Sequence, residues 1–172
     1  MIQQEAVSKN AGPVARPKNP PYVRPANTKV TNYTRSVEIN CSAAKAYPFC
    51  FSLEGFMTQF PHPVKDYVGP DQWAKDEIAS FKYKQLVWTN WKVQFIEAEE
   101  NVKFCDVMIE GYLKVFEHTH SFKTLGPNRI VYTDSIDFAS GLGTFIDRVV
   151  GLRVMDSLFS KRHLLLKPAL ER

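Results

Sequence analysis

The middle of the chain is a succession of short segments in which hydrophobic and polar residues alternate. Residues 89–95 alternate most clearly and place Trp91, Val93 and Phe95 on one face. Alternation with a period of two predicts half-buried strands, and the short connections between them predict an antiparallel meander. The expected strands cover residues 64–68, 81–85, 89–95, 104–109, 115–123 and 129–138.

The segment before this meander predicts one further strand and two short helices. Residues 33–40 alternate as a first strand, and Ser42 follows as a helix N-cap. Pro48 lies inside the helix that Ser42 begins, and because an interior proline costs about 3 kcal/mol, a kink or a restart is expected there. A second short helix is expected over residues 53–60, where two prolines end it.

The last part of the chain has the pattern of one long helix. From Thr144 to Lys167 apolar residues recur at spacings of three and four, and Pro168 is expected to end the helix. The apolar stripe is wider than that of an ordinary surface helix, so the helix should be heavily buried. Gly151 would allow a close approach of another element at mid-helix. The apolar residues include Phe145, Ile146, Val149, Val150, Leu152, Val154, Met155, Leu158, Phe159, Leu165 and Leu166.

The order of these elements predicts the fold class. A strand, two short helices, a run of antiparallel strands and a long C-terminal helix together indicate an α+β protein of the helix-grip type. In this arrangement a curved antiparallel sheet wraps around the long C-terminal helix. Residues 32–172 should form that single domain, and they suffice for a real core. The space between the sheet and the helix is where a cavity is expected.

Residues 1–31 differ from the rest in composition. They carry five basic residues, one acidic residue and five prolines, whereas the remainder is electrically balanced, so the net charge of +4 belongs to this segment. Few large apolar residues occur there, which predicts a disordered or polyproline-like tail. It could be a linker, a weak binder of anionic surfaces, a targeting peptide or an inert extension. Because the domain itself lacks a basic excess, nucleic-acid binding through it is not expected.

The overall composition indicates a soluble globular protein. Hydrophobic residues make up 44% and charged residues 23%, and no stretch reaches the roughly 18 apolar residues of a membrane span. No secretory signal pattern is evident at the N-terminus. The three cysteines show no metal-binding spacing, so they are interpreted as buried thiols in a reducing compartment. A cytoplasmic location is expected.

The strands 115–123 and 129–138 contain the candidate chemistry. If residues 124–128 form a five-residue loop, His118 lies opposite Asp134, and His120 lies opposite Tyr132. The other face of this hairpin is polar, so these four side chains should face the helix. A directly opposed pair is close enough to hydrogen-bond. The pair could perform acid–base chemistry, hold the polar end of a ligand, or form a satisfied internal network.

A metal site is an alternative role for this pair, and two further histidines occur elsewhere in the chain. The His-x-His spacing of His118 and His120, together with Asp134, could ligate zinc or iron. Because only these three candidate ligands are evident, no metal and no cofactor are expected. His62, between two prolines, is expected in an exposed loop. His163 is expected on a solvated face near the helix C-terminus, where positive charge is favourable.

Four short motifs resemble those of the START/Bet v 1-like superfamily, in particular its polyketide cyclase/dehydrase and lipid-transport branch. Residues 104–112 resemble the pattern F-x-D-x-Q-x-x-G-P, and residues 116–122 resemble W-x-H-x-H-x-F. Residues 132–143 resemble T-x-D-x-V-x-Y followed by G-x-L-G, and residues 158–162 resemble L-F-x-x-R. The order of elements agrees over residues 33–168. Met108, Tyr112 and Phe116 stand where the patterns have Gln, Pro and Trp.

This resemblance implies binding of an apolar small molecule, such as a lipid, a quinone or a polyketide-like compound, in an internal cavity. The alternative is a cyclase or dehydratase that uses His118 and Asp134 on a polyketide-like substrate. A further alternative is a protein-interaction domain, which an exposed apolar patch outside the cavity mouth would favour. No oligomeric state is implied. The expected ligand-binding residues are Trp91, Val93, Phe95, Phe116, His120, Tyr132, Ile136, Met155 and Phe159.

Overall fold

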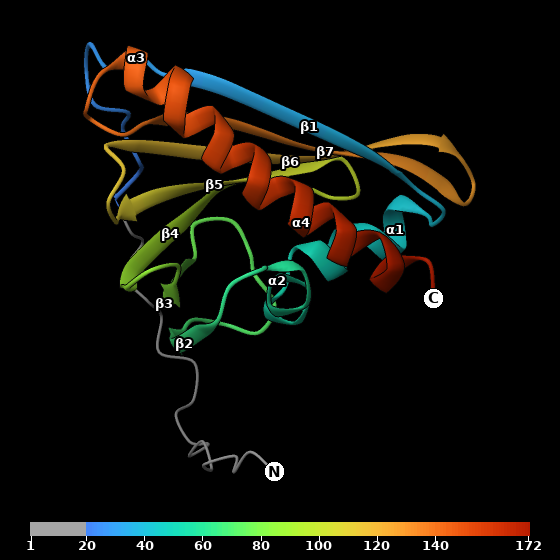
Figure 1. Ribbon diagram of the computed structural model, residues 1–172. Helices are drawn as coiled ribbons and strands as arrows, with labels where there is room; N and C mark the ends of the chain where they lie inside the picture. The colour runs from blue at the N-terminus through green and yellow to red at the C-terminus, as the bar shows by residue number, and fades with distance from the viewer. Residues whose placement is uncertain (1–19) are drawn as a thin grey trace, which may run out of the picture.

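A curved, seven-stranded antiparallel sheet wraps around one long helix in the computed structural model, which describes residues 20–172 (Figure 1). The strand order is β1-β7-β6-β5-β4-β3-β2, so that the first strand pairs with the last. This architecture confirms the predicted α+β helix-grip fold. The strands are β1 Thr31–Ile39, β2 Val64–Val68, β3 Ile78–Lys84, β4 Trp88–Glu99, β5 Lys103–Glu110, β6 Val115–Gly126 and β7 Arg129–Ala139.

Two short helices follow β1 and close one end of the sheet (Figure 1). The first is α1 Ala43–Cys50, and the second is α2 Leu53–Gln59. The Ser42 hydroxyl caps α1 as predicted, by accepting a hydrogen bond from the Lys45 backbone N–H. Pro48 remains inside α1, which ends two residues later. Aromatic side chains from the C-terminal end of α1 and from the sheet pack together in one part of the core, where Phe51, which directly follows α1, stacks on Phe104.

The C-terminal helical region differs from its prediction in two ways. It consists of α3 Thr144–Ile146, a π-helical turn η1 Asp147–Gly151, and α4 Leu152–Leu170, and it continues through Pro168 instead of ending there. Its apolar stripe is only partly buried. Met155 and Phe159 are buried against the sheet, whereas Phe145 is 76% exposed and Val150 is 51% exposed. A helix buries one face against a sheet, and the stripe is wider than that face.

Gly151 permits the close packing that the sequence suggested. A Cβ atom at this position would lie 2.5 Å from the Phe138 ring on β7, far inside van der Waals contact. Phe138 in turn packs with Met155 and Phe159 in the second part of the core, between the sheet and α4. Among residues 20–172, no helix has the length and apolarity that crossing a bilayer requires.

Part of the segment expected to be a disordered tail contacts the outer face of the sheet. Arg24 forms ion pairs with Glu117 on β6 and with Asp137 on β7, the latter at 2.8 Å. The Pro20 carbonyl accepts a hydrogen bond from the Gln94 side chain on β4. These contacts are polar, so hydrophobic periodicity could not indicate them. The expectations for residues 1–19 lie outside the described residues.

Candidate functional site

The register of the β6–β7 hairpin differs by two residues from the predicted one. Strand pairing continues to Gly126 and Arg129, with an irregularity after Thr124, so the turn is tighter than the expected five-residue loop. His120 therefore lies opposite Asp134, and His118 lies opposite Ile136. Because side chains alternate with a period of two, a shift of two residues leaves every side chain on its predicted face.

The predicted hydrogen bond between His118 and Asp134 is confirmed, but as a diagonal contact. His118 Nε2 donates to Asp134 Oδ1 at 2.8 Å. The same oxygen accepts from the Tyr132 hydroxyl at 2.7 Å, and Oδ2 accepts from His163 Nε2 at 2.7 Å. Both oxygens of this fully buried carboxylate are therefore occupied by protein groups.

Arg162 on α4 provides the positive charge that balances Asp134. Its Nε lies 3.8 Å from Asp134 Oδ2 and donates to the Gln59 side chain at 3.0 Å. Burial alone would raise the pKa of Asp134, but Arg162 and the hydrogen bonds from His118 and His163 hold it well below its usual value. Burial would likewise lower the pKa of Arg162, and Asp134 instead raises it. The two groups form an internal ion pair.

His120 and Tyr132 connect this ion pair to the rest of the site. His120 Nδ1 lies 2.6 Å from the Tyr132 hydroxyl oxygen, which also accepts from Arg162 Nη2 at 3.0 Å. Burial, with a contribution from neighbouring His118, lowers the pKa of His120 to about 3, so its ring is neutral at pH 7. Burial raises the pKa of the Tyr132 hydroxyl well above its usual value, so it stays protonated.

Asp106 on β5 completes the cluster, although it was not among the predicted site residues. It is paired with His118 across the β5–β6 ladder, and its Oδ1 lies 3.1 Å from His120 Nε2 and 3.7 Å from His118 Nδ1. The sequence contained one signal for it, since Asp106 is the acidic residue of the motif at residues 104–112.

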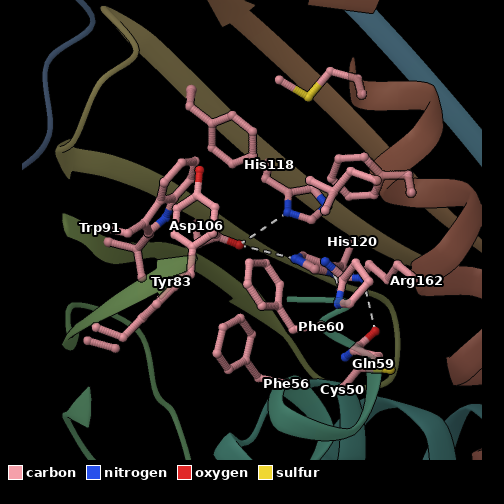
Figure 2. Close-up of a pocket in the computed structure, with 18 of the residues that line it drawn as sticks. Cys50, Phe56, Gln59, Phe60, Tyr83, Trp91, Asp106, His118, His120 and Arg162 are labelled. Atoms are coloured by element: carbon pink, nitrogen blue, oxygen red, sulfur yellow. Dashed lines mark hydrogen bonds and ion pairs between the residues drawn. The ribbon is translucent and has the colours of Figure 1, made fainter. Parts of the chain in front are cut away.

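A cavity of about 80 Å³ lies between the sheet, α2 and α4. Figure 2 shows aromatic side chains, including Phe56, Phe60, Tyr83 and Trp91, on one side and the polar cluster on the other. The cavity is therefore apolar apart from one polar wall. The polar or charged residues that line it are Gln59, Gln85, Asp106, His118, His120 and Arg162.

The predicted ligand-binding residues fall into two groups, according to the strand or helix that carries them. Those on β4, β6 and α4 line the cavity, whereas the predicted residues on β7, which are Tyr132 and Ile136, do not. Asp134, also on β7, is likewise absent from the lining. The β7 side chains lie behind the polar wall, where α4 and β6 cover them, so they are fully buried without reaching the cavity. The predicted residues that line it are Trp91, Val93, Phe95, Phe116, His118, His120, Met155 and Phe159.

The expectation for His163 is wrong. Its side chain is 5% exposed and donates to Asp134, so it belongs to the internal network and not to a solvated face. Arg162 is also buried, and only Lys161 of this basic run is exposed. The helical period contained the signal, because Phe159, Arg162 and His163 lie three and four residues apart and share one face. His62 is half-buried in its loop.

Comparison with known proteins identifies the fold but no close relative. No protein-family model matches the sequence, and no curated protein matches it at a significant level. A START superfamily protein from Mycobacterium smegmatis aligns over 81% of this chain and 97% of its own, with 14% identity and a TM-score of 0.64. An aromatase/cyclase from Streptomyces aligns over 83% of this chain and 92% of its own, with 10% identity and a TM-score of 0.63.

A plant enzyme gives a similar match. Norcoclaurine synthase from Thalictrum flavum, in complex with dopamine and hydroxybenzaldehyde, aligns over 97% of this chain and 96% of its own, with 12% identity and a TM-score of 0.65. Together with the strand order, these likenesses show that the chain has the helix-grip fold of the START/Bet v 1-like superfamily.

Proposed function

We propose that the protein binds a compact apolar molecule, with a ring in the cavity and a hydrogen-bonding group directed at Asp106, His118 and His120. The observation that carries this proposal is the composition of the cavity wall, which is aromatic on most sides and polar at one place. Such an arrangement is typical of small-molecule sites, where apolar surface provides affinity and a few polar groups fix orientation.

The volume of the cavity limits the ligand. About 80 Å³ is well below the roughly 300–1,000 Å³ of pockets that enclose a whole drug-sized molecule. An open groove of about 460 Å³ lies beside it and shares Gln85, Val154 and Leu158 with the cavity wall. A phenol or quinone ring in the cavity with its substituent in the groove fits both spaces. A lipid chain would occupy the groove and not the cavity.

Tryptophan fluorescence offers a direct test. Trp91 and Trp73 line the cavity, whereas Trp88 is 41% exposed outside it. Titration with a naphthoquinone should quench the wild-type signal in a saturable way. Trp88→Phe should keep this response, and Trp91→Phe should lose much of it. Equal responses in the two variants would mean that the probe binds elsewhere.

A matched pair of substitutions tests whether the cavity itself is the site. Ala79 lines the cavity and is 1% exposed, whereas Ala98 is exposed on β4. Ala79→Leu should fill part of the cavity and weaken naphthoquinone binding at least tenfold, at a packing cost of about 1–3 kcal/mol. Ala98→Leu should leave binding unchanged. Unchanged binding in the folded Ala79→Leu protein would exclude the cavity.

A second function, cyclisation or dehydration of a polyketide-like substrate, is favoured by the orientation of His118. Its Nε2 is held by Asp134, and its ring lines the cavity, so Nδ1 could act as a general base. Asp134 would then be a positioning residue, because it does not line the cavity. An active protein whose His118→Gln variant binds substrate normally but loses turnover would support this function. Full turnover in that variant would exclude it.

The protein-interaction alternative remains a prediction. The feature in its favour is that the groove beside the cavity exposes Leu86, Val149 and Val150.

A further inference from the structure

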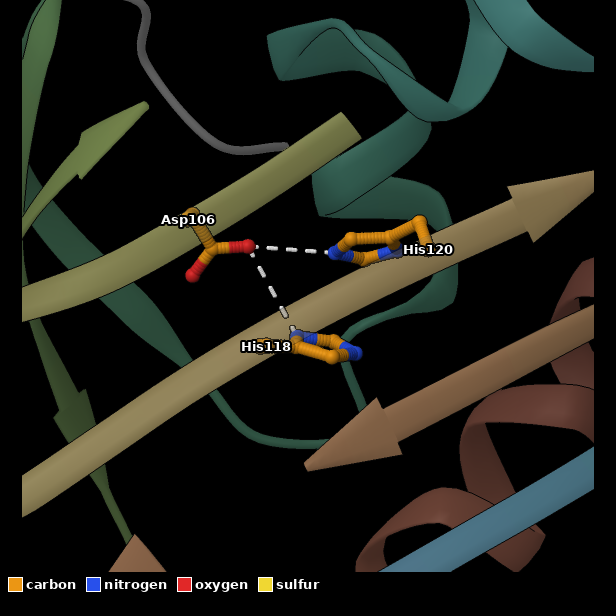
Figure 3. Close-up of side chains that lie close together, drawn as sticks. All are labelled: Asp106, His118 and His120. Atoms are coloured by element: carbon orange, nitrogen blue, oxygen red, sulfur yellow. Dashed lines mark hydrogen bonds and ion pairs between the residues drawn. The ribbon is translucent and has the colours of Figure 1, made fainter. Parts of the chain in front are cut away.

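Two histidine nitrogens and one carboxylate oxygen converge on a single point at the polar wall (Figure 3). Asp106 Oδ1 lies 3.1 Å from His120 Nε2 and 3.7 Å from His118 Nδ1. One atom from each of the three side chains lies within 4.8 Å of the others, and all three residues are buried. They belong to adjacent strands, β5 and β6, so strand pairing fixes their spacing.

The hydrogen bonds behind the two rings hold them in place. The Asp134 carboxylate can only accept, so His118 Nε2 and the Tyr132 hydroxyl both donate to it. His120 can take either of two tautomers. With its proton on Nε2 it donates to Asp106 while Nδ1 accepts from Arg162. With its proton on Nδ1 it donates to the Tyr132 oxygen, and a metal ion could then take the place of the proton between Nε2 and Asp106.

We propose that Asp106, His118 and His120 bind a divalent transition-metal ion such as Zn²⁺, for which two imidazoles and one carboxylate are a common ligand set. Bonds of about 2.0–2.2 Å place tetrahedral zinc ligands roughly 3.3–3.6 Å apart. The separations of 3.1 and 3.7 Å are close to that range. A fourth position would face the cavity, where an oxygen of a bound molecule could occupy it. This inference does not depend on which molecule the cavity binds.

The surrounding groups support a metal. The ring nitrogen of His118 that would not ligate donates to Asp134, which is how metal-binding histidines are usually oriented. That of His120 lies 2.6 Å from the Tyr132 hydroxyl, to which it would donate when the metal is bound. One neighbouring group disfavours a metal ion, because the positively charged Arg162 has its Nη2 3.2 Å from His120 Nδ1. Its charge is balanced by Asp134, which leaves the negative charge of Asp106 for the metal.

Titration of the chelator-treated full chain with Zn²⁺ by calorimetry, and with Co²⁺ by visible absorption, tests the site. We expect one ion per chain with a Kd below about 10 µM, and Co²⁺ bands of a four-coordinate site. Asp106→Asn and His120→Gln should each weaken Zn²⁺ binding at least about a hundredfold, because losing only a supporting group already costs 10–100-fold. His62→Gln should bind as the wild type does.

Two results would overturn the proposal. The first is a wild-type protein that binds no Zn²⁺ with a Kd below about 10 µM. This result would exclude the metal site even if a variant failed to fold. The second is an equal loss of binding in His62→Gln. Repeating the naphthoquinone titration with excess chelator separates the two proposals. Quenching that persists in excess chelator would support binding of the molecule in the cavity, whatever the Zn²⁺ titration shows.

Discussion

Asp134→Asn removes the negative charge that faces Arg162, His118 and His163 while it preserves the volume of the side chain. The introduced amide could still accept through its oxygen, but its NH₂ group would face a histidine donor. Arg162 would remain buried without its counter-charge. Breaking a buried ion pair from one side costs about 3–5 kcal/mol, because the remaining charge is desolvated and unpaired. For a chain of this size, that loss lowers Tm by roughly 6–20 °C.

Urea unfolding followed by circular dichroism at pH 7 measures this loss. The matched control is Asp156→Asn, which removes the acidic partner of Arg35 in an ion pair whose two side chains are 38% and 61% exposed. An exposed pair contributes about 0–1 kcal/mol, so the control should change stability little. If Asp134→Asn also costs less than about 1 kcal/mol, the assignment of Asp134 as the centre of a stabilising network is wrong.

The pH dependence of the same pair of proteins follows from the lowered pKa of Asp134. A carboxyl whose pKa is lower in the folded state contributes stability above its unfolded value of about 3.9, and this contribution is lost as the pH falls below that value. The difference in unfolding free energy between wild type and Asp134→Asn should therefore be constant from pH 5 to 7 and shrink below about pH 4. A difference that grows on acidification would contradict the ionised state of Asp134.

Three further predictions concern other parts of the molecule. Removing residues 1–19 should leave Tm unchanged, whereas removing residues 1–30 should cost about 1–2 kcal/mol because the Arg24 ion pairs are lost; equal effects in a thermal melt would contradict this. Gly55→Ala should cost at least about 3 kcal/mol, because its Cβ would lie 1.8 Å from a backbone carbonyl oxygen, whereas Gly126→Ala meets no atom and should be neutral in urea unfolding. Burial raises the pKa of Cys105 to about 12, so mass spectrometry should show iodoacetamide labelling at pH 8 at least about a hundredfold slower in the native than in the unfolded chain.

Most of the fold could be predicted from the sequence because its signals are local. Alternation placed β2 at its observed residues, and the Ser42 cap located the start of α1. The register of the β6–β7 hairpin could not be predicted in this way. It depends on how Leu125 is accommodated in an irregular turn, which the alternating pattern of the strands does not specify.

The candidate site was only partly predictable for a related reason. Alternation placed His118, His120 and Asp134 on one face, and this is correct. Asp106 required knowing that β5 lies beside β6 in a particular register, and Arg162 required knowing which face of α4 meets that sheet. These are long-range relations between segments. The cavity volume depends on how all the lining side chains pack together, so no local pattern contains it.

The pairing of β1 with β7 has a consequence for how the chain acquires its structure. Thr31 pairs with Phe138, and Ile39 pairs with Ile130, so roughly one hundred residues separate the partners in sequence. During synthesis the first strand is made early, but β7, its neighbour in the described sheet, emerges from the ribosome after most of the domain has been translated. Until then its edge is unprotected and open to pairing with other chains. Folding is therefore expected to be slow and to complete after translation, with aggregation as its main competitor.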